Sequence, residues 1–246
     1  MGARIGAVRH GADCYFHASG NSFSEVEENA RQAMEQGFRH VRVQVATPGY
    51  VGYGARGNAP AEGARNEVVG PTSPRDIWEP APYVRLVPKL FEHLRTKLGD
   101  DVELLHDVHE RVTLNQAINL CKALEPYRLF FLEDPLPPED NDHFRLLRQQ
   151  TSTPLATGEL STHSRNTCPS SYNFGVHEGS GFLKETQEVF AGCPEIKIGY
   201  MLAQERPGLG IEVDENLAAK FPIPAGPPNF EYSWETTRRR DGTVIP

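Results

Sequence analysis

The sequence predicts an α/β fold, a parallel (β/α) barrel that is TIM-like but incomplete, and three observations support this prediction. First, three short apolar runs end in the carboxylates Asp107, Glu133 and Glu159, which are 26 and 26 residues apart. Second, helix-period patterns fill both intervals, so strand and helix alternate as they do in parallel sheets. Third, only 18 residues separate Glu159 from Glu178, too few for one βαβ unit of about 30 residues.

The same alternation extends to the other elements. Strands are expected at 12–18, 39–45, 102–107, 128–133 and 154–159, and one more short strand at 173–178. Helices are expected at 22–37, 83–98, 113–124, 139–149 and 182–190. Ser22 and Thr113 begin their helices with capping boxes, because Glu25 and Gln116 stand three residues further on. A turn is expected over 19–21.

The predicted elements divide the chain into two parts. Residues 1–178 form the partial barrel that carries the metal site, and residues 179–246 form a loop-rich C-terminal extension that packs on it. Residues 46–82 are irregular and rich in Gly, Pro and Asn. A stretch of this length is either functional, as a lid or a dimer-contact loop, or disordered.

Composition excludes several classes of protein. The chain has 246 residues, of which 38% are hydrophobic and 24% are charged, the balance of a globular protein with a core. The net charge of −8 argues against a nucleic-acid surface. No apolar run is long enough for a membrane span, and the start of the chain lacks the apolar region of a signal peptide. The four cysteines lack metal-type spacing and are expected as reduced thiols of a cytoplasmic protein.

The three acids at the predicted strand tips allow two interpretations. Asp and Glu are common in turns, so each acid alone is most simply a solvated loop residue or a helix cap. Three acids at equal spacing, with His109 two residues after the first, favour a divalent metal site instead. Parallel sheets carry their chemistry at the C-terminal tips of the strands, and hard oxygen ligands suit Mg²⁺. The pattern alone leaves both interpretations open.

Eight sequence blocks resemble the enolase superfamily and, within it, the mannonate dehydratase group of sugar-acid dehydratases. The blocks keep the order of that family, cover nearly the whole chain, and lie at residues 15–20, 41–44, 104–109, 124–128, 131–135, 153–159, 173–178 and 207–215. The resemblance implies a barrel of the enolase-superfamily type. It also implies a homo-oligomeric, cytoplasmic enzyme that acts on a small sugar acid such as D-mannonate and gives a 2-keto-3-deoxy acid.

The resemblance also implies a role for each matched residue. Asp107, Glu133 and Glu159 are the expected Mg²⁺ ligands. Tyr53 paired with Arg42 is the expected base that removes the proton beside the substrate carboxylate, and His109 is the expected acid that helps to expel the 3-hydroxyl. The expected substrate contacts are Glu178, Gln44 and His17. Arg42 and Gln44 alternate along one predicted strand and therefore share a face. An arginine within a strand is usually an edge or surface residue; in a barrel the alternative is that it points into the mouth of the site.

The chain also departs from the family pattern. Its first residues already match the barrel, so the N-terminal capping domain of the family is not matched, and the segment for barrel strands six and seven has no room between Glu159 and Glu178. Two further hypotheses therefore stand beside the dehydratase: a truncated, catalytically inactive relative with a binding role or no retained function, and a longer enzyme from which segments are missing. The short interval predicts poor turnover of aldonates by this chain.

Overall fold

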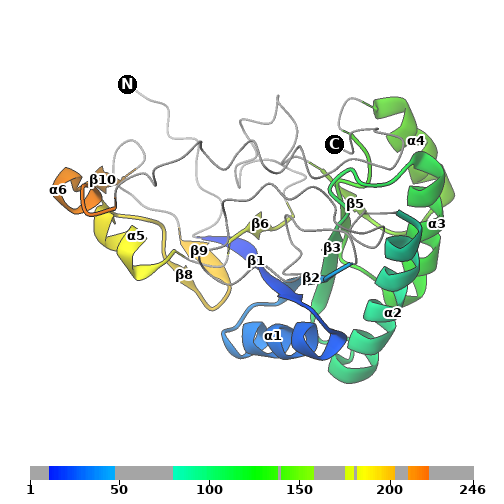
Figure 1. Cartoon of the computed structure of the whole chain (residues 1–246), viewed down its shortest axis with the longest axis horizontal. Coiled ribbons are helices and arrows are strands. Elements are labelled where there is room, and N and C mark those ends of the chain that lie inside the picture. Colours follow the sequence, from blue (N-terminus) through cyan, green and yellow to red (C-terminus); the bar gives the residue numbers. More distant parts are fainter. Residues whose placement is uncertain are drawn as a thin grey trace, which may run out of the picture.

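The computed structural model describes residues 11–47, 80–137, 140–157, 175–179, 182–202 and 210–221. Figure 1 shows the strands of the N-terminal half in the middle of the molecule, with helices α1 to α4 bordering them in an arc. The short elements α5, α6 and β8 lie at the opposite end of the long axis.

Five strands pair in parallel and in sequence order, as the alternating pattern predicts. Each strand pairs with the next one along the chain, which is the arrangement of successive βα units. The strands are β1 (Gly11–Gly20), β2 (His40–Val45), β3 (Glu103–Asp107), β4 (Leu132–Glu133) and β5 (Leu155–Ala156).

A sixth parallel strand lies on the other side of β1. This strand, β6 (His177–Glu178), places His177 opposite Cys14 and Glu178 opposite Tyr15. Because a (β/α) barrel closes when its last strand pairs with its first, β6 takes the place of the last barrel strand. In the described ranges no strand connects β5 to β6, so this part of the chain forms a partial α/β barrel.

Helices connect the strands and cover the outer face of the sheet. They are α1 (Phe23–Glu35), α2 (Pro80–Leu98), α3 (Leu114–Leu124) and α4 (Asn141–Gln150), and a 3₁₀ turn, η2 (Glu125–Tyr127), follows α3. The Ser22 side chain caps α1 by accepting from the backbone N–H of Glu25. A complete capping box between Thr113 and Gln116 begins α3, so both predicted helix starts are confirmed. The predicted box at Ser22 is incomplete, because the Glu25 carboxylate accepts from the backbone N–H of Asn21 and not of Ser22.

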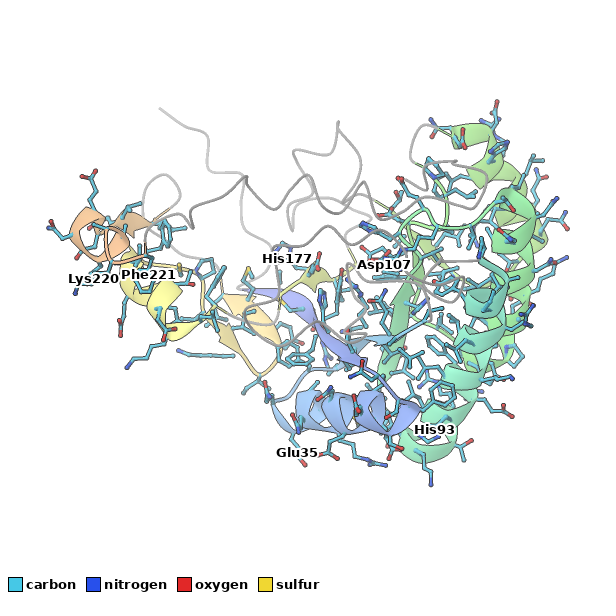
Figure 2. All side chains as sticks on the ribbon, viewed as in Figure 1. Glu35, His93, Asp107, His177, Lys220 and Phe221 are labelled. Atoms are coloured by element: carbon cyan, nitrogen blue, oxygen red, sulfur yellow. The ribbon has the colours of Figure 1, made fainter. Side chains whose placement is uncertain are left out.

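The main hydrophobic core lies between these helices and the sheet. Leu90, Phe91 and Leu94 of α2 are fully buried against Val41 and Leu104 of the sheet. Each such side chain contributes about 1.5–3 kcal/mol by leaving water. In Figure 2 the side chains of α1, α2 and α3 fill the space against the strands, whereas Asp107 lies on the inner side of the arc. The packing thereby fixes the strands whose other face carries the site.

The inner face of the sheet has an apolar floor and a polar layer above it. Tyr15, Leu105 and Phe131 form a second, smaller buried cluster on this face. Two residues further along their strands stand His17, Asp107 and Glu133. Because side chains alternate along a strand, these polar residues face the same side as the floor.

The C-terminal third forms short elements that pair with the barrel or with one another. Strands β8 (Ile196–Lys197) and β9 (Tyr200–Leu202) form a hairpin, and β9 pairs antiparallel with residues 11–13 of β1. The remaining elements are α5 (Lys184–Val189), β7 (Phe190–Ala191), β10 (Glu212–Val213) and α6 (Glu215–Ala218), and β10 pairs with β7. The division at residue 178 stays a prediction.

Several predicted boundaries were wrong. Ser19 and Gly20 belong to β1 instead of a turn, because they pair with Gln44 and Val45 of β2. The fourth strand is confined to Leu132–Glu133, and the fifth α-helix ends at Val189 because Phe190 pairs with β10. Among the described residues, no helix is both long and apolar enough to cross a membrane.

Candidate metal and active site

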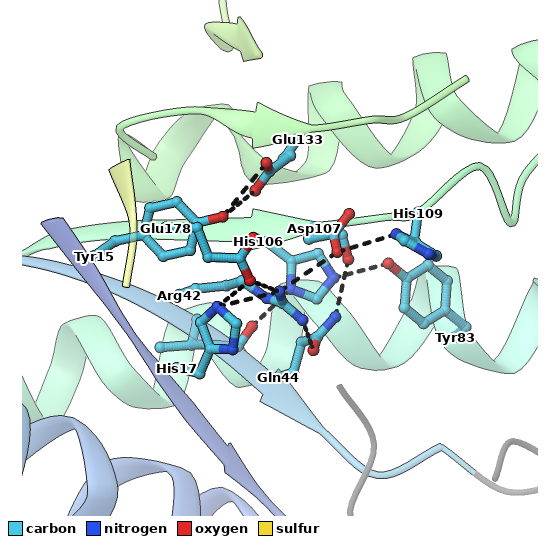
Figure 3. A network of polar contacts seen from close by, with 11 residues as sticks. Tyr15, His17, Arg42, Gln44, Tyr83, His106, Asp107, His109, Glu133 and Glu178 are labelled. Atoms are coloured by element: carbon cyan, nitrogen blue, oxygen red, sulfur yellow. Dashed lines mark hydrogen bonds and ion pairs between the residues drawn. The ribbon is translucent and has the colours of Figure 1, made fainter. Parts of the chain in front are cut away.

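Strand register gathers six of the predicted site residues on the inner face of the sheet. His17 of β1 lies opposite Arg42 of β2, and Asp107 of β3 lies opposite Glu133 of β4. Gln44 follows two residues after Arg42, and Glu178 joins from β6 on the other side of β1. Figure 3 shows these side chains pointing toward one another.

Asp107 and Glu133 form the acidic centre of this group. Burial raises the pKa of Glu133, and the nearby Asp107 and Asp134 carboxylates raise it further, to about 8. Burial acts on Asp107 in the same direction. However, His109, Arg42 and Arg111 outweigh this effect and hold the pKa of Asp107 below its usual value. Asp107 is therefore charged at neutral pH. Glu133 can lie beside it only if Glu133 keeps its proton or if a cation binds between the two carboxylates.

The Asp107 carboxylate is the group best suited to bind a cation in this site. The residue is fully buried, and neither of its oxygens has a hydrogen-bond partner in the described part of the chain. The nitrogen atoms near its Oδ2 are His109 Nδ1 at 3.5 Å and Arg42 Nη1 at 3.7 Å. A buried carboxylate without hydrogen bonds is costly, and a divalent cation removes that cost. Asp107 with Glu133 therefore fits the oxygen ligand set of Mg²⁺.

Arg42 lies inside the barrel and not at a sheet edge. Its side chain is 2% exposed. Its Nη2 donates to Gln44 Oε1 at 2.6 Å, and Gln44 Nε2 donates to the backbone carbonyl of Asp107 at 3.1 Å. Its Nη1 also lies 3.7 Å from Glu178 Oε1. Arg42 thus links three strands and places a fixed positive charge at the centre of the site.

His17 and Glu178 form the accessible side of the site. His17 Nε2 lies 2.8 Å from Glu178 Oε1, and these side chains are 32% and 35% exposed. The pair comes from β1 and β6, the two strands that meet where a barrel closes. Both groups can exchange this contact for one to a polar ligand.

His109 approaches Asp107 through an unusual backbone conformation. His109 and Glu110 have φ values of 54° and 59°, the left-handed region that non-glycine residues rarely adopt. The backbone N–H of Glu110 donates to the carbonyl of Asp134 at 2.8 Å, which holds the turn against the segment after β4. The turn brings the His109 ring to the Asp107 carboxylate and leaves its side chain 23% exposed.

The structure adds Tyr15, which the sequence reasoning missed. Tyr15 Oη donates to Glu133, at 3.1 Å from Oε2 and 3.4 Å from Oε1. Burial, with Glu133 and Glu178 nearby, raises the pKa of the phenol far above its usual value, so its proton stays in place. The alternation of Tyr15 with His17 along β1 is the sequence signal that could have found it.

A second missed pair lies behind the site, on the outer face of the sheet. His106 Nδ1 lies 2.7 Å from the carbonyl of Val43, to which it donates, and its Nε2 accepts from Tyr83 Oη at 2.8 Å. Burial lowers the pKa of His106 to about 4, so the ring is neutral. The contact with Tyr83 joins α2 to β3 across 23 residues, and no local pattern predicts it.

Two predicted site residues, Tyr53 and Glu159, lie outside the described residues. Within the described ranges, no three His, Cys, Asp or Glu side chains converge as a metal site, and the third expected ligand is Glu159. The role of Glu159 as the third metal ligand and the role of Tyr53 as the base paired with Arg42 therefore stay predictions.

Comparisons with known proteins identify the family. The enolase C-terminal domain-like family matches residues 25–168. The D-galactonate dehydratase family member RspA of Pantoea ananatis is 35% identical, over 97% of this chain and 72% of its own length. A D-mannonate dehydratase of a Caulobacter strain is 34% identical, over 88% of this chain and 68% of its own length.

A solved structure gives the same result. The crystal structure of an enolase from Pantoea ananatis with bound D-gluconate and Mg has a TM-score of 0.77 and 34% identity, and the match covers 97% of this chain and 72% of that one. The alignment to RspA spans 308 positions, more than the 246 residues of this chain, so RspA carries segments inside the matched span that have no counterpart here. The chain belongs to the enolase superfamily and, within it, to the D-galactonate dehydratase family of sugar-acid dehydratase homologues.

Proposed function

We propose that the chain is a Mg²⁺-dependent sugar-acid dehydratase that converts an aldonate of the D-mannonate type to its 2-keto-3-deoxy acid. The observation that carries this proposal is the buried Asp107 carboxylate, which accepts no hydrogen bond from the described residues and lies opposite Glu133. The names of the relatives support it, because they include D-galactonate and D-mannonate dehydratases, and one solved relative holds D-gluconate and Mg.

Asp107, Glu133 and Glu159 are the residues that would hold the metal. Mg²⁺, when bound, supplies charge to orient the substrate carboxylate and to stabilise the negative charge that develops as the neighbouring C–H bond breaks. Burial of Asp107 and Glu133 excludes competing water and strengthens their interaction with a cation.

The two proton transfers fall to the remaining catalytic residues. Tyr53 takes the proton from C2, and Arg42 favours the phenolate because a nearby cation lowers the pKa of a phenol. His109 gives a proton to the 3-hydroxyl as the C3–O bond breaks, and water leaves. The enol that results gains a proton at C3 from water, loses the proton of its C2 hydroxyl to water and becomes the 2-keto acid. The backbone turn at His109 fixes its ring beside the same carboxylate that binds the metal.

Substrate hydroxyls are the proposed partners of the polar rim. His17, Gln44 and Glu178 surround Arg42, and His17 and Glu178 are partly exposed. A sugar acid presents several hydroxyls in a row, and each can exchange one of these side-chain contacts for its own hydrogen bonds. The homo-oligomeric state and the cytoplasmic location that the resemblance implies stay predictions.

A catalytically inactive relative is the second candidate. Two observations favour it: no described strand connects β5 to β6, and RspA carries internal segments that this chain lacks. Substrate walls built by such segments would be missing, and the metal site alone would remain.

A dehydration assay separates the two candidates. Purified chain is incubated with Mg²⁺ and, in turn, D-mannonate, D-gluconate and D-galactonate, and the 2-keto-3-deoxy product is measured. His109→Asn is the test variant, and His143→Asn, on exposed α4, is the matched control. Product formation that His109→Asn abolishes and His143→Asn leaves intact supports the dehydratase. Turnover equal in all three proteins, or absent with every substrate, contradicts it.

A further inference from the structure

We propose that Tyr15 is a positioning residue for Glu133, and that its hydroxyl holds this carboxylate in the orientation that Mg²⁺ binding requires. The inference rests on the proposed function, because it takes Glu133 as a metal ligand. It adds a residue from the floor of the barrel to a site otherwise built at the strand tips.

Tyr15 is itself held rigidly. Its side chain is buried, and its ring meets Phe131 edge-on with the ring centroids 6.3 Å apart. Its backbone lies between two parallel partners, His40 on β2 and Glu178 on β6. In Figure 3 the ring lies below Glu133 and aims its hydroxyl at the carboxylate. A donor fixed in this way limits the rotation of the carboxylate that accepts its hydrogen bond.

Glu133 needs an external restraint. It is the last residue of β4, a strand of two residues, and Asp107 stands directly opposite on β3. Where both carboxylates are ionised, their repulsion favours Glu133 rotamers that turn away from Asp107 and separate the two ligands. The hydroxyl of Tyr15 reaches both oxygens of Glu133, at 3.1 Å and 3.4 Å, and opposes that rotation.

The hydrogen bond leaves the carboxylate able to bind a cation. An ionised carboxylate has about four lone-pair sites, so one donor from Tyr15 leaves the others for a metal. Partners of metal ligands that act through a hydrogen bond commonly orient the ligand, and their loss weakens metal binding about 10- to 100-fold.

The chain provides a matched control in Tyr83. It is also a buried tyrosine whose hydroxyl hydrogen-bonds a described side chain, His106, at 2.8 Å. It lies on α2, on the other face of the sheet from Glu133. Tyr83→Phe and Tyr15→Phe thus each remove one buried hydroxyl, and among the contacts of the described residues the Tyr15 hydroxyl is the one that reaches a proposed ligand.

The test is a calorimetric Mg²⁺ titration of the full chain and of both variants at one pH, after circular dichroism has shown that they are folded. Tyr15→Phe is expected to raise the Kd for Mg²⁺ about 10- to 100-fold, and Tyr83→Phe is expected to leave it within twofold. An unchanged Kd in Tyr15→Phe, or an equal rise in both variants, overturns the proposal. A wild-type chain that binds no Mg²⁺ overturns the metal site and this inference together, whereas binding that Tyr15→Phe does not alter overturns the inference alone.

A spectroscopic measurement covers the case in which Tyr15→Phe does not fold. The chain is labelled with ¹³C at the tyrosine Cζ atoms and carries Tyr53→Phe, so that the other proposed site tyrosine is silent. A hydroxyl bound to a ligand carboxylate changes its hydrogen bond when the metal binds, so one resonance is expected to shift with Mg²⁺. No shift in any tyrosine resonance at saturating Mg²⁺ overturns the proposal.

Discussion

Asp107 and Glu133 lie opposite each other on adjacent strands. In the absence of metal the pKa of Glu133 is about 8, so this side chain is protonated at neutral pH. The folded-state pKa is raised above the unfolded value of 4.5, so this residue stabilises the fold at low pH and loses that effect as pH rises toward 8. We therefore expect the free energy of unfolding of the metal-free chain to fall by about 2 kcal/mol between pH 6.5 and 8.

Urea unfolding in EDTA measures this loss. Glu133→Gln is neutral at every pH and is expected to remove the loss, so the variant is more stable than wild type at pH 8. It is also expected to lose the stabilisation that Mg²⁺ gives the wild-type chain. Glu35→Gln, an exposed acid at the end of α1, is the control and should keep the wild-type slope. An equal slope in wild type and Glu133→Gln would contradict the account.

His106 gives a second pH dependence, of opposite sign. Burial lowers its pKa from 6.5 to about 4. Between these values the unfolded chain binds the proton and the folded chain does not, so stability falls as pH drops from 6.5 toward 4. The contribution is about 3 kcal/mol.

The measurement compares wild type with His106→Asn by urea unfolding at pH 4.5 and pH 7. The variant is less stable at pH 7, because it loses the bond to Tyr83, but its loss between the two values is expected to be smaller by about 3 kcal/mol. His143→Asn, on an exposed helix, is the control. A pH response of His106→Asn that matches wild type would show that this ring does not stay neutral in the fold.

At the scale of elements, local signals predicted where helices begin, and pairing decided where strands end. Ser22 and Thr113 carry capping signals within four residues of chain, and both were confirmed. Ser19 and Gly20 look like a turn locally, but they pair with β2 and extend β1. Arg42 could lie at an edge or inside on sequence grounds, and its pairing on both sides, with His17 of β1 and Leu105 of β3, places it inside.

The hairpin β8–β9 gives the prediction at this scale. Ile198 and Gly199 at its turn have φ values of 51° and 74°, as in the two-residue turns that suit hairpins. A Cβ on Gly199 would lie 2.8 Å from the carbonyl oxygen of Gly37, which follows α1. Gly199→Ala is therefore expected to weaken the packing of the hairpin against that end of α1.

Gly99 supplies the matched control. Its φ is 72°, but nothing lies within 4 Å of the Cβ position. Gly99→Ala should thus cost only the left-handed conformation, about 1–2 kcal/mol, and Gly199→Ala should cost at least 1 kcal/mol more because of the close contact. Thermal unfolding of the two variants measures the difference. Equal losses would mean that the turn can move away from Gly37 without cost.

At the scale of the molecule, the incomplete barrel could be predicted from the short interval between Glu159 and Glu178. The position of the site could be predicted from the alternation of strands and helices. The 18 residues between Glu159 and Glu178 cannot hold a βαβ unit, and β6 indeed pairs with β1 without a described strand between β5 and β6. Alternation along β1 could place Tyr15 on the face of His17, but the contacts of Tyr15 with Glu133 and of Tyr83 with His106 join distant parts of the chain and could not be predicted. The remaining question is whether a partial barrel assembles its metal site.

A calorimetric Mg²⁺ titration of the wild-type chain, with and without D-mannonate, tests that central claim most directly. Asp107→Asn is the test variant, and Asp100→Asn, an exposed residue after α2, is the control. The account predicts Mg²⁺ binding that D-mannonate strengthens, a large loss of affinity in Asp107→Asn and none in Asp100→Asn. Absence of binding in the wild-type chain, or equal affinity in Asp107→Asn, would contradict it.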